Sequence, residues 1–98
     1  MSIRVEFYGI PRSRAGVGEM VLNVGEGGAK LSQVLSELAA QFPELAADCI
    51  HHAEASSGTA SLQPGYTASV GGQRFVSDPD ELLRPGDSLL IMSADPGG

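Results

Sequence analysis

The last two residues of the sequence, Gly97 and Gly98, are the ones whose type and position suggest the most specific chemistry. Neither has a Cβ atom, so the pair can pass through a channel that is too narrow for any side chain. The group that they would deliver is the α-carboxylate of Gly98. From the end of an apolar run at Met92, about six residues at ~3.3 Å each could reach roughly 20 Å into a partner. The other interpretation is a frayed chain end, which most domains have.

The composition is that of one small acidic domain. The 98 residues fit a single domain, and a hydrophobic content of 42% is enough for one modest core. The net charge of −6 argues against a nucleic-acid partner or an anionic membrane, because no basic stripe could replace phosphate counterions. An acidic surface instead favours partners that have basic clefts.

The sequence predicts neither a membrane span nor an export signal. No apolar run approaches the ~20 residues that cross a bilayer. Residues 1–6 lack a signal-peptide pattern, and the single cysteine, Cys49, has no internal disulfide partner. We therefore expect a cytoplasmic protein without a membrane partner.

Two strands are predicted in the first quarter of the chain. Apolar side chains occupy every second position of residues 3–8 and again of residues 18–24. Gly9-Ile10-Pro11 breaks the first strand, and residues 12–16 are expected to form a polar loop. The pattern indicates a β-hairpin with a longer connection than a tight turn.

One long helix is predicted after the glycine-rich break at residues 25–28, where the apolar period changes from two to 3.6 residues. Its apolar stripe consists of Leu31, Val34, Leu35, Leu38, Ala39 and Phe42. Pro43 ends this helix, and residues 44–50 could add a helical turn or two.

The segment 48–63 is polar and has no clear period, which predicts a surface loop outside the core. Cys49, His51 and His52 raise the question of a metal site. Adjacent histidines cannot easily both point at one ion, however, and no second ligand pair has the spacing of a zinc site. We expect no bound metal.

The second half of the chain is predicted to be mostly strands. Residues 66–70 alternate, Gly71-Gly72 is a hairpin turn signal, and residues 73–76 form a short return strand. Asp78 is a plausible N-cap for a helical turn over residues 78–83. A turn at residues 85–87 follows.

The final run, residues 89–92, is apolar on both faces and is expected to be a central, buried strand. We place it beside residues 3–8, which makes that pair parallel. The element order then predicts an α+β domain with the long helix packed across one face of the sheet. Residues 1–92 form this domain, and residues 93–98 form a flexible tail that leaves from the middle of the sheet.

Several motifs, spread over most of the chain, resemble one known family. They are Phe7-Tyr8-Gly9 with Arg12 and Gly16, Leu31-Ser32-Gln33-Val34-Leu35 with Leu38, Phe42 and Pro43, Val70-Gly71-Gly72, Leu83-Arg84-Pro85-Gly86-Asp87, and the final Gly97-Gly98. With these motifs the chain resembles the small subunit of molybdopterin synthase and, more widely, ubiquitin-like sulfur carriers of the MoaD/ThiS type.

The resemblance implies a ubiquitin-like β-grasp fold, with a mixed sheet of four to five strands and one main helix on one face. It also implies a sulfur carrier whose Gly98 is adenylated and then converted to a thiocarboxylate. The implied partners are an E1-like adenylyltransferase, which uses ATP, and the large subunit of molybdopterin synthase. The chain has no Walker-type phosphate loop and is expected to bind no cofactor and to be no enzyme on its own.

The resemblance also suggests where partners dock. Phe75 and Met92 match contact positions of the family, although simple core packing is an equal alternative for both. Arg12 lies on a neighbouring loop and could instead be a solvated charge. Asp95 could complement a basic partner face, and Pro96 should keep the tail extended.

Three functions remain open from the sequence. The first is a sulfur carrier in molybdenum-cofactor synthesis. The second is a carrier for thiamine or another sulfur metabolite, or a protein modifier, for which Lys30 would be the one internal lysine acceptor. The third is a binding module with an inert tail.

Overall fold

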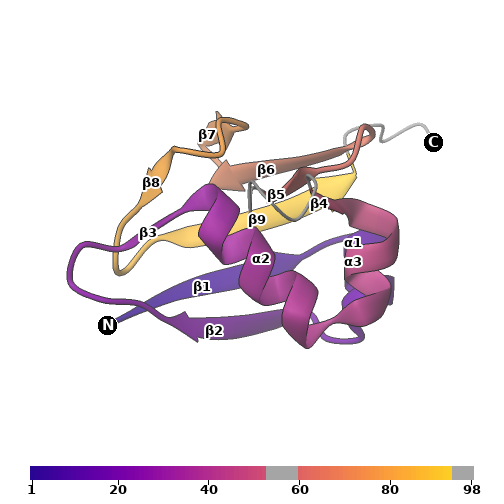
Figure 1. Ribbon diagram of the computed structural model, residues 1–98, viewed down its shortest axis with the longest axis horizontal. Coiled ribbons are helices and arrows are strands. Elements are labelled where there is room, and N and C mark those ends of the chain that lie inside the picture. Colours follow the sequence, from indigo (N-terminus) through magenta and orange to yellow (C-terminus); the bar gives the residue numbers. More distant parts are fainter. Residues whose placement is uncertain (53–59, 94–98) are drawn as a thin grey trace.

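The computed structural model describes residues 1–52 and 60–93 and shows a helix layer packed on one face of a five-stranded sheet (Figure 1). The strand order in the sheet is β2 (Glu19–Asn23), β1 (Ser2–Phe7), β9 (Ser88–Ser93), β6 (Tyr66–Val70), β7 (Arg74–Val76). The main helix, α2 (Leu31–Gln41), crosses the sheet. The shorter helices α1 (Ile10–Ala15) and α3 (Pro43–Cys49) lie together at one end of it. None of the helices in these residues is long and apolar enough to cross a membrane.

The first two strands, β1 (Ser2–Phe7) and β2 (Glu19–Asn23), pair antiparallel as predicted. The predicted polar loop between them is wrong, because residues 10–15 form the helix α1 (Ile10–Ala15). Pro11 suits the first turn of a helix, where its missing N–H costs nothing. Gly16 ends the helix in the left-handed conformation and donates its N–H to the carbonyl of Arg12 at 2.9 Å.

Helix α2 follows the short strand β3 (Ala29–Lys30) and buries the predicted stripe. The side chain of Gln33 accepts a hydrogen bond from the backbone N–H of Lys30 at 2.8 Å, which satisfies a free donor at the helix start. Leu31, Val34, Leu35 and Leu38 are at most 2% exposed. Pro43 does end α2, and it also begins the next helix, α3 (Pro43–Cys49).

The prediction of a surface loop over residues 48–63 is wrong for the part that the structure describes. Helix α3 is followed by β4 (Ile50–His52), which pairs antiparallel with β5 (Ala60–Leu62). Cys49, Ile50 and Ala60 belong to the buried core. Residues 53–59 lie outside the described residues. The sequence does not reveal this hairpin because β4 and β5 have three residues each, too few to show a clear period.

The hairpin of β6 (Tyr66–Val70) and β7 (Arg74–Val76) is confirmed. The predicted helical turn over residues 78–83 is wrong. The Asp78 carboxylate accepts from the N–H of Asp80, and the Asp78 carbonyl accepts from the N–H of Glu81, both at 2.9 Å. This tight turn leads into β8 (Leu82–Leu83), where pairing with β3 buries Leu83 completely.

The last strand, β9 (Ser88–Ser93), is central, as predicted. It runs parallel to β1, with Phe7 opposite Ile91, and antiparallel to β6. The expectation that both of its faces are buried is wrong. Leu89 and Ile91 are buried under the helices, whereas Leu90 and Met92 are only half-buried, because the helices cover one face of the sheet alone.

Candidate functional site

The final described residues of the chain, Met92 and Ser93, are paired with the neighbouring strand β6. Thr67 lies opposite Met92 in the β6–β9 ladder, and Tyr66 lies opposite Ser93. On the other side the pairing with β1 ends at Ile91, one residue before Met92. A Cβ atom at Gly9 would lie 3.5 Å from the Ser93 hydroxyl oxygen. We call Met92 and Ser93 the tail root, because residues 94–98 continue from them.

The sheet face that the helices leave uncovered, here called the open face, carries an apolar patch near the tail root. Side chains alternate between the faces of a strand, so the register places Phe75, Ser69 and Leu90 in one row across β7, β6 and β9. Met92 follows Leu90 on the same face, two residues along β9. A Cβ atom at Gly72 would lie 3.8 Å from the Leu90 side chain, so the hairpin turn packs beside it.

Phe75 is the most exposed large apolar side chain of the patch. It is 73% exposed, and Met92 is half-buried, so neither belongs to the buried core. Core packing is therefore excluded for both residues. Exposed aromatic side chains beside half-buried aliphatic ones are typical of protein-binding surfaces. The structure thus brings Phe75 and Met92 onto one face, as the docking prediction requires.

Tyr8 extends the open-face patch on the β1 side, and sequence reasoning missed it. Its hydroxyl donates to the Glu6 carboxylate at 2.6 Å, which places both side chains on the open face. This hydrogen bond raises the pKa of Tyr8, so the hydroxyl stays a donor at neutral pH. Leu90 was missed as well. The signal for both residues was their alternation with buried neighbours in β1 and β9.

Arg12 lies on helix α1 rather than on a loop, and its side chain is exposed. Its guanidinium packs over Gly18, where a Cβ atom would lie 3.5 Å from the guanidinium carbon. The positive charge of Arg12 also lowers the pKa of Tyr8, although the Glu6 hydrogen bond outweighs it. Arg12 is therefore a cation at the margin of the open-face patch.

Four of the predicted site residues, Asp95, Pro96, Gly97 and Gly98, lie outside the described residues. Their roles stay predictions. What the structure adds is the position of the tail root from which they continue.

The residues that suggested a metal site do not form one in the described part of the chain. Cys49 is fully buried, and burial raises the pKa of its thiol, against which a hydrogen bond from Tyr66 acts. A buried neutral thiol is a poor nucleophile and a poor metal ligand. His51 is exposed. Residues 1–52 and 60–93 contain no cluster of three His, Cys, Asp or Glu side chains that could hold a metal ion.

No protein-family model matches the sequence, and no curated protein matches it either. Solved structures do match. Small archaeal modifier protein 1 from Methanosarcina acetivorans shares 23% identity at a TM-score of 0.76, with 99% of this chain and 96% of that chain covered. A putative molybdopterin converting factor, subunit 1, from Pyrococcus furiosus shares 22% identity at a TM-score of 0.71, with 95% of this chain and 97% of that chain covered.

Urm1 from Trypanosoma brucei also shares 22% identity at a TM-score of 0.71, with 99% of this chain and 95% of that chain covered. The fold of this chain is therefore the ubiquitin-like β-grasp, as its motifs predict. The similarity extends over nearly the full length of each of these proteins.

Proposed function

We propose that this ubiquitin-like β-grasp protein is a sulfur carrier that acts through the α-carboxylate of Gly98. An E1-like partner attaches that carboxylate to the α-phosphate of ATP, and pyrophosphate leaves. Sulfide sulfur from a donor then attacks the acyl carbon and expels AMP, which leaves a thiocarboxylate on Gly98. The chain itself supplies the tail and the docking surface, while ATP belongs to the partner.

The observation that carries this proposal is the position of the tail root on the central strand, beside the open-face patch. A partner that covers Phe75, Leu90 and Met92 has the start of the tail at the edge of its contact surface. The tail root is paired with β6, and the residue before it, Ile91, is paired with both β1 and β6, so the tail starts from the middle of the sheet. This arrangement suits delivery of a chain end into a partner's active site.

For the acceptor of the sulfur we propose a molybdopterin precursor, with the chain serving as the small subunit of the synthase. The family resemblance of the motifs supports this choice, and so does the shared fold of the putative molybdopterin converting factor, subunit 1, from Pyrococcus furiosus. A protein modifier is the second candidate, because small archaeal modifier protein 1 from Methanosarcina acetivorans has the same fold. In that case a lysine amine attacks the acyl carbon of adenylated Gly98, expels AMP and forms an isopeptide bond.

Intact-mass spectrometry tests the proposal. The first measurement establishes that the mature protein carries a free carboxylate at Gly98. Incubation with the activating enzyme, ATP and a sulfur donor should then replace one oxygen by sulfur. A chain with one alanine added after Gly98 is the control and should stay unchanged. An unchanged mass for the native chain, with an enzyme proven active, would refute the carrier function.

The same material separates the two acceptors. Mixing the thiocarboxylated protein with the large synthase subunit and the molybdopterin precursor should return the carboxylate form and yield dithiolene product. The modifier function is tested in a second mixture, in which the native protein is incubated with the activating enzyme, ATP and lysine-containing proteins. Isopeptide-linked conjugates there, without dithiolene formation in the first mixture, would instead establish the modifier function.

A further inference from the structure

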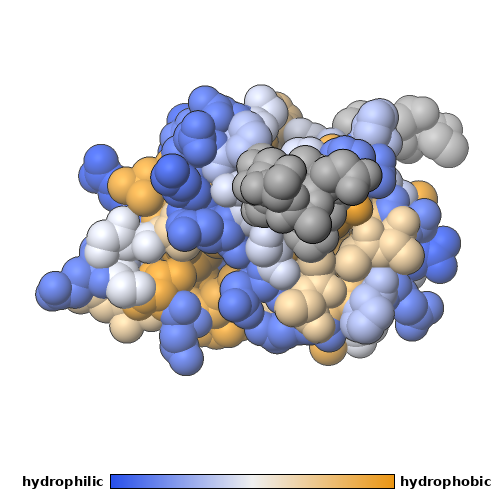
Figure 2. All heavy atoms as spheres, viewed as in Figure 1, coloured by the Kyte–Doolittle hydropathy of each residue, from blue (hydrophilic) through white to orange (hydrophobic). Residues whose placement is uncertain are grey.

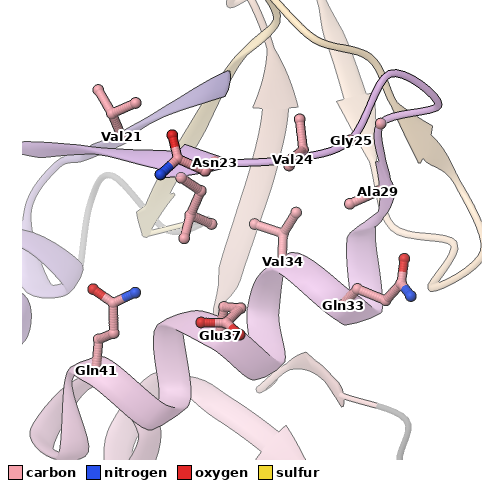
Figure 3. A pocket seen from close by; sticks show the side chains of 11 residues that line it. Val21, Asn23, Val24, Gly25, Ala29, Gln33, Val34, Glu37 and Gln41 are labelled. Carbon is pink, nitrogen blue, oxygen red and sulfur yellow. The ribbon is translucent and has the colours of Figure 1, made fainter. Parts of the chain in front are cut away.

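A groove of about 460 Å³ lies between the edge strand β2 and helix α2, away from the tail root (Figure 3). Val21, Asn23 and Val24 line it from the strand side, and Val34, Glu37 and Gln41 line it from the helix. In Figure 3 the Val34 side chain points from α2 toward the strand. Figure 2 shows apolar side chains beside a hollow in this region.

The strand wall of this groove has unpaired backbone groups. β2 is the edge of the five-stranded sheet. At its ends, Val24 donates to the carbonyl of Met1 at 2.8 Å, and the carbonyl of Gly18 accepts from Phe7 at 2.9 Å. Bonded pairs alternate along an antiparallel ladder, so the even-numbered residues of β2 face β1. The N–H and C=O groups of Val21 and Asn23 therefore point outward, at the free edge.

The β2 edge has few of the features that normally prevent another strand from pairing. Such edges usually carry lysine, proline or a bulge, or are very short. The strand β2, with sequence Glu-Met-Val-Leu-Asn, has a single charge at its start, and Val21 in its middle is 57% exposed. The opposite edge, β7, has three residues, and its Arg74 pairs with Glu81 at 2.7 Å.

The charge of the groove favours a basic occupant. Glu37 is the one ionisable side chain among the residues that line it, and it is exposed. Over residues 1–52 and 60–93 the ion pairs are made by other carboxylates, and Glu37 takes part in none of them. A lysine or arginine entering between the walls would meet an unpaired carboxylate with no cation competing for it.

We propose that this groove binds an extended, basic segment of a partner protein, which adds to β2 as a sixth strand. The free groups of Val21 and Asn23 supply the main-chain hydrogen bonds. Alternate apolar side chains of the segment pack on Val24 and Val34, and a basic side chain pairs with Glu37. The helix wall from Gln33 to Gln41 spans roughly 12 Å at ~1.5 Å per residue, which matches about four residues of strand.

Binding at the groove leaves the proposed carrier chemistry free. β1 lies between β2 and the central strand β9, so a groove-bound segment contacts neither the open-face patch nor the tail root. A partner held there could stay bound while the tail is activated or discharged. The inference does not depend on what happens at Gly98.

The test uses the full chain and three short synthetic peptides in amide-detected NMR. The first peptide is acetyl-Lys-Val-Ile-Val-Ile-Lys-amide. The second has Glu in place of both Lys, and the third has Pro in place of the first Ile. The first should bind with a Kd below about 1 mM, shifting the Val21 and Asn23 amides and slowing their exchange with solvent. The second and third should each bind at least about tenfold more weakly.

Two helix variants make the test specific. Glu37→Lys should weaken binding of the basic peptide about tenfold, while Glu44→Lys, the same charge change on an exposed residue of α3, should leave it unchanged. Both should melt within a few degrees of the native protein.

Several outcomes would overturn the proposal. These are unshifted Val21 and Asn23 amides at millimolar basic peptide, shifts confined to Phe75 and Leu90, or equal binding of the proline peptide. A stable dimer through β2 that the basic peptide cannot compete away would mean that a second copy of this chain occupies the edge.

Discussion

The backbone N–H of Tyr8 donates to the carbonyl oxygen of Ile91 at 3.0 Å, one residue beyond the point where β1 pairs with β9. This bond adds one hydrogen bond to the parallel ladder at Ile91, two residues before β9 ends at Ser93. It fixes this part of β9 against the segment that leads into α1. Continued by one residue, the same register brings Tyr8 level with Met92.

Replacing Phe75 by alanine should weaken partner activation without affecting the fold. The side chain is 73% exposed, so little packing is lost and the melting temperature should stay within a few degrees. Loss of an aromatic anchor should lower kcat/KM for ATP–pyrophosphate exchange about tenfold. Leu82→Ala is the matched control, since Leu82 is 46% exposed but lies on β8, outside the open face. Equal effects of both variants would argue against docking through Phe75.

Gly97→Val should separate tail access from stability. If the tail threads a channel shaped for bare backbone, a branched Cβ blocks entry, and exchange should fall at least about a hundredfold. The melting temperature should hardly change, because residue 97 is expected to pack against nothing. Thermal melting and pyrophosphate exchange, measured on the same preparation, check both expectations. Normal exchange by this variant would show that the glycines are not needed for threading.

Gly28 should tolerate no side chain, whereas its neighbour Gly27 should. Gly28 has a φ of 77°, and a Cβ atom there would clash with the backbone carbonyl oxygen of Leu83. Gly28→Ala must separate β3 from β8 and should lower the free energy of unfolding by about 2 kcal/mol or more. A Cβ atom at Gly27 meets nothing within 4 Å, so Gly27→Ala is the control. Urea unfolding measures the free energy of unfolding of both variants. Similar free energies for Gly28→Ala and Gly27→Ala would contradict the close approach of Gly28 to Leu83.

The β4–β5 hairpin should be required for stability. Ile50 is 5% exposed and pairs with Leu62, so Ile50→Ala should cost about 2–5 kcal/mol through lost burial and a cavity. As a control, residues 53–59 are replaced by seven Gly and Ser residues, which keeps the loop length and its closure entropy. That variant should melt near the native temperature. A stable Ile50→Ala protein would mean that the hairpin is dispensable.

Cys49 should make stability decrease at alkaline pH. Burial raises the pKa of its thiol above the ordinary value of 9.0, an effect that Asp48 reinforces and that Tyr66 and Arg14 oppose. The folded state therefore favours the neutral thiol. The stability that the neutral thiol contributes is complete below the pKa of Cys49 in the unfolded chain. It is lost as the pH rises through the higher pKa of Cys49 in the folded protein.

Urea unfolding between pH 7 and about pH 10 measures the effect. The native protein should lose stability more steeply above pH 9.0 than Cys49→Ala, which has no thiol to ionise. The pKa of Tyr66 is raised by burial and also by Cys49, so the difference between the two proteins reports the coupled Cys49–Tyr66 pair. Parallel curves would show that Cys49 does not contribute.

The periodic elements of this fold could be predicted from the sequence, and so could its centre. The alternation in β1 and the stripe on α2 each follow from one strong period. The apolar run of β9 placed that strand in the middle of the sheet and beside β1. Since the tail continues from β9, the location of the candidate site followed from the same observation.

The remaining elements depend on tertiary contacts that no local pattern reveals. Asp78 has the features of a helix N-cap, but pairing of β8 with β3, in which Leu83 is fully buried, holds the chain in an extended strand instead. Ala60 looks like a loop residue, yet it is fully buried because β5 packs on α2. The open face could not be predicted for the same reason. Leu90 is partly exposed only because the helices cover the other side of the sheet, and no local pattern shows which side that is.

The order in which the strands occur along the chain has a consequence for biosynthesis. β9 lies between β1 and β6, and both precede it by many residues, so the sheet stays divided until β9 has left the ribosome. A nascent or truncated chain that lacks β9 exposes two separate hairpins and has no tail root. If the chain is the carrier that we propose, only a chain that has completed its sheet would present the tail to the proposed activating enzyme, and we expect folding to precede activation.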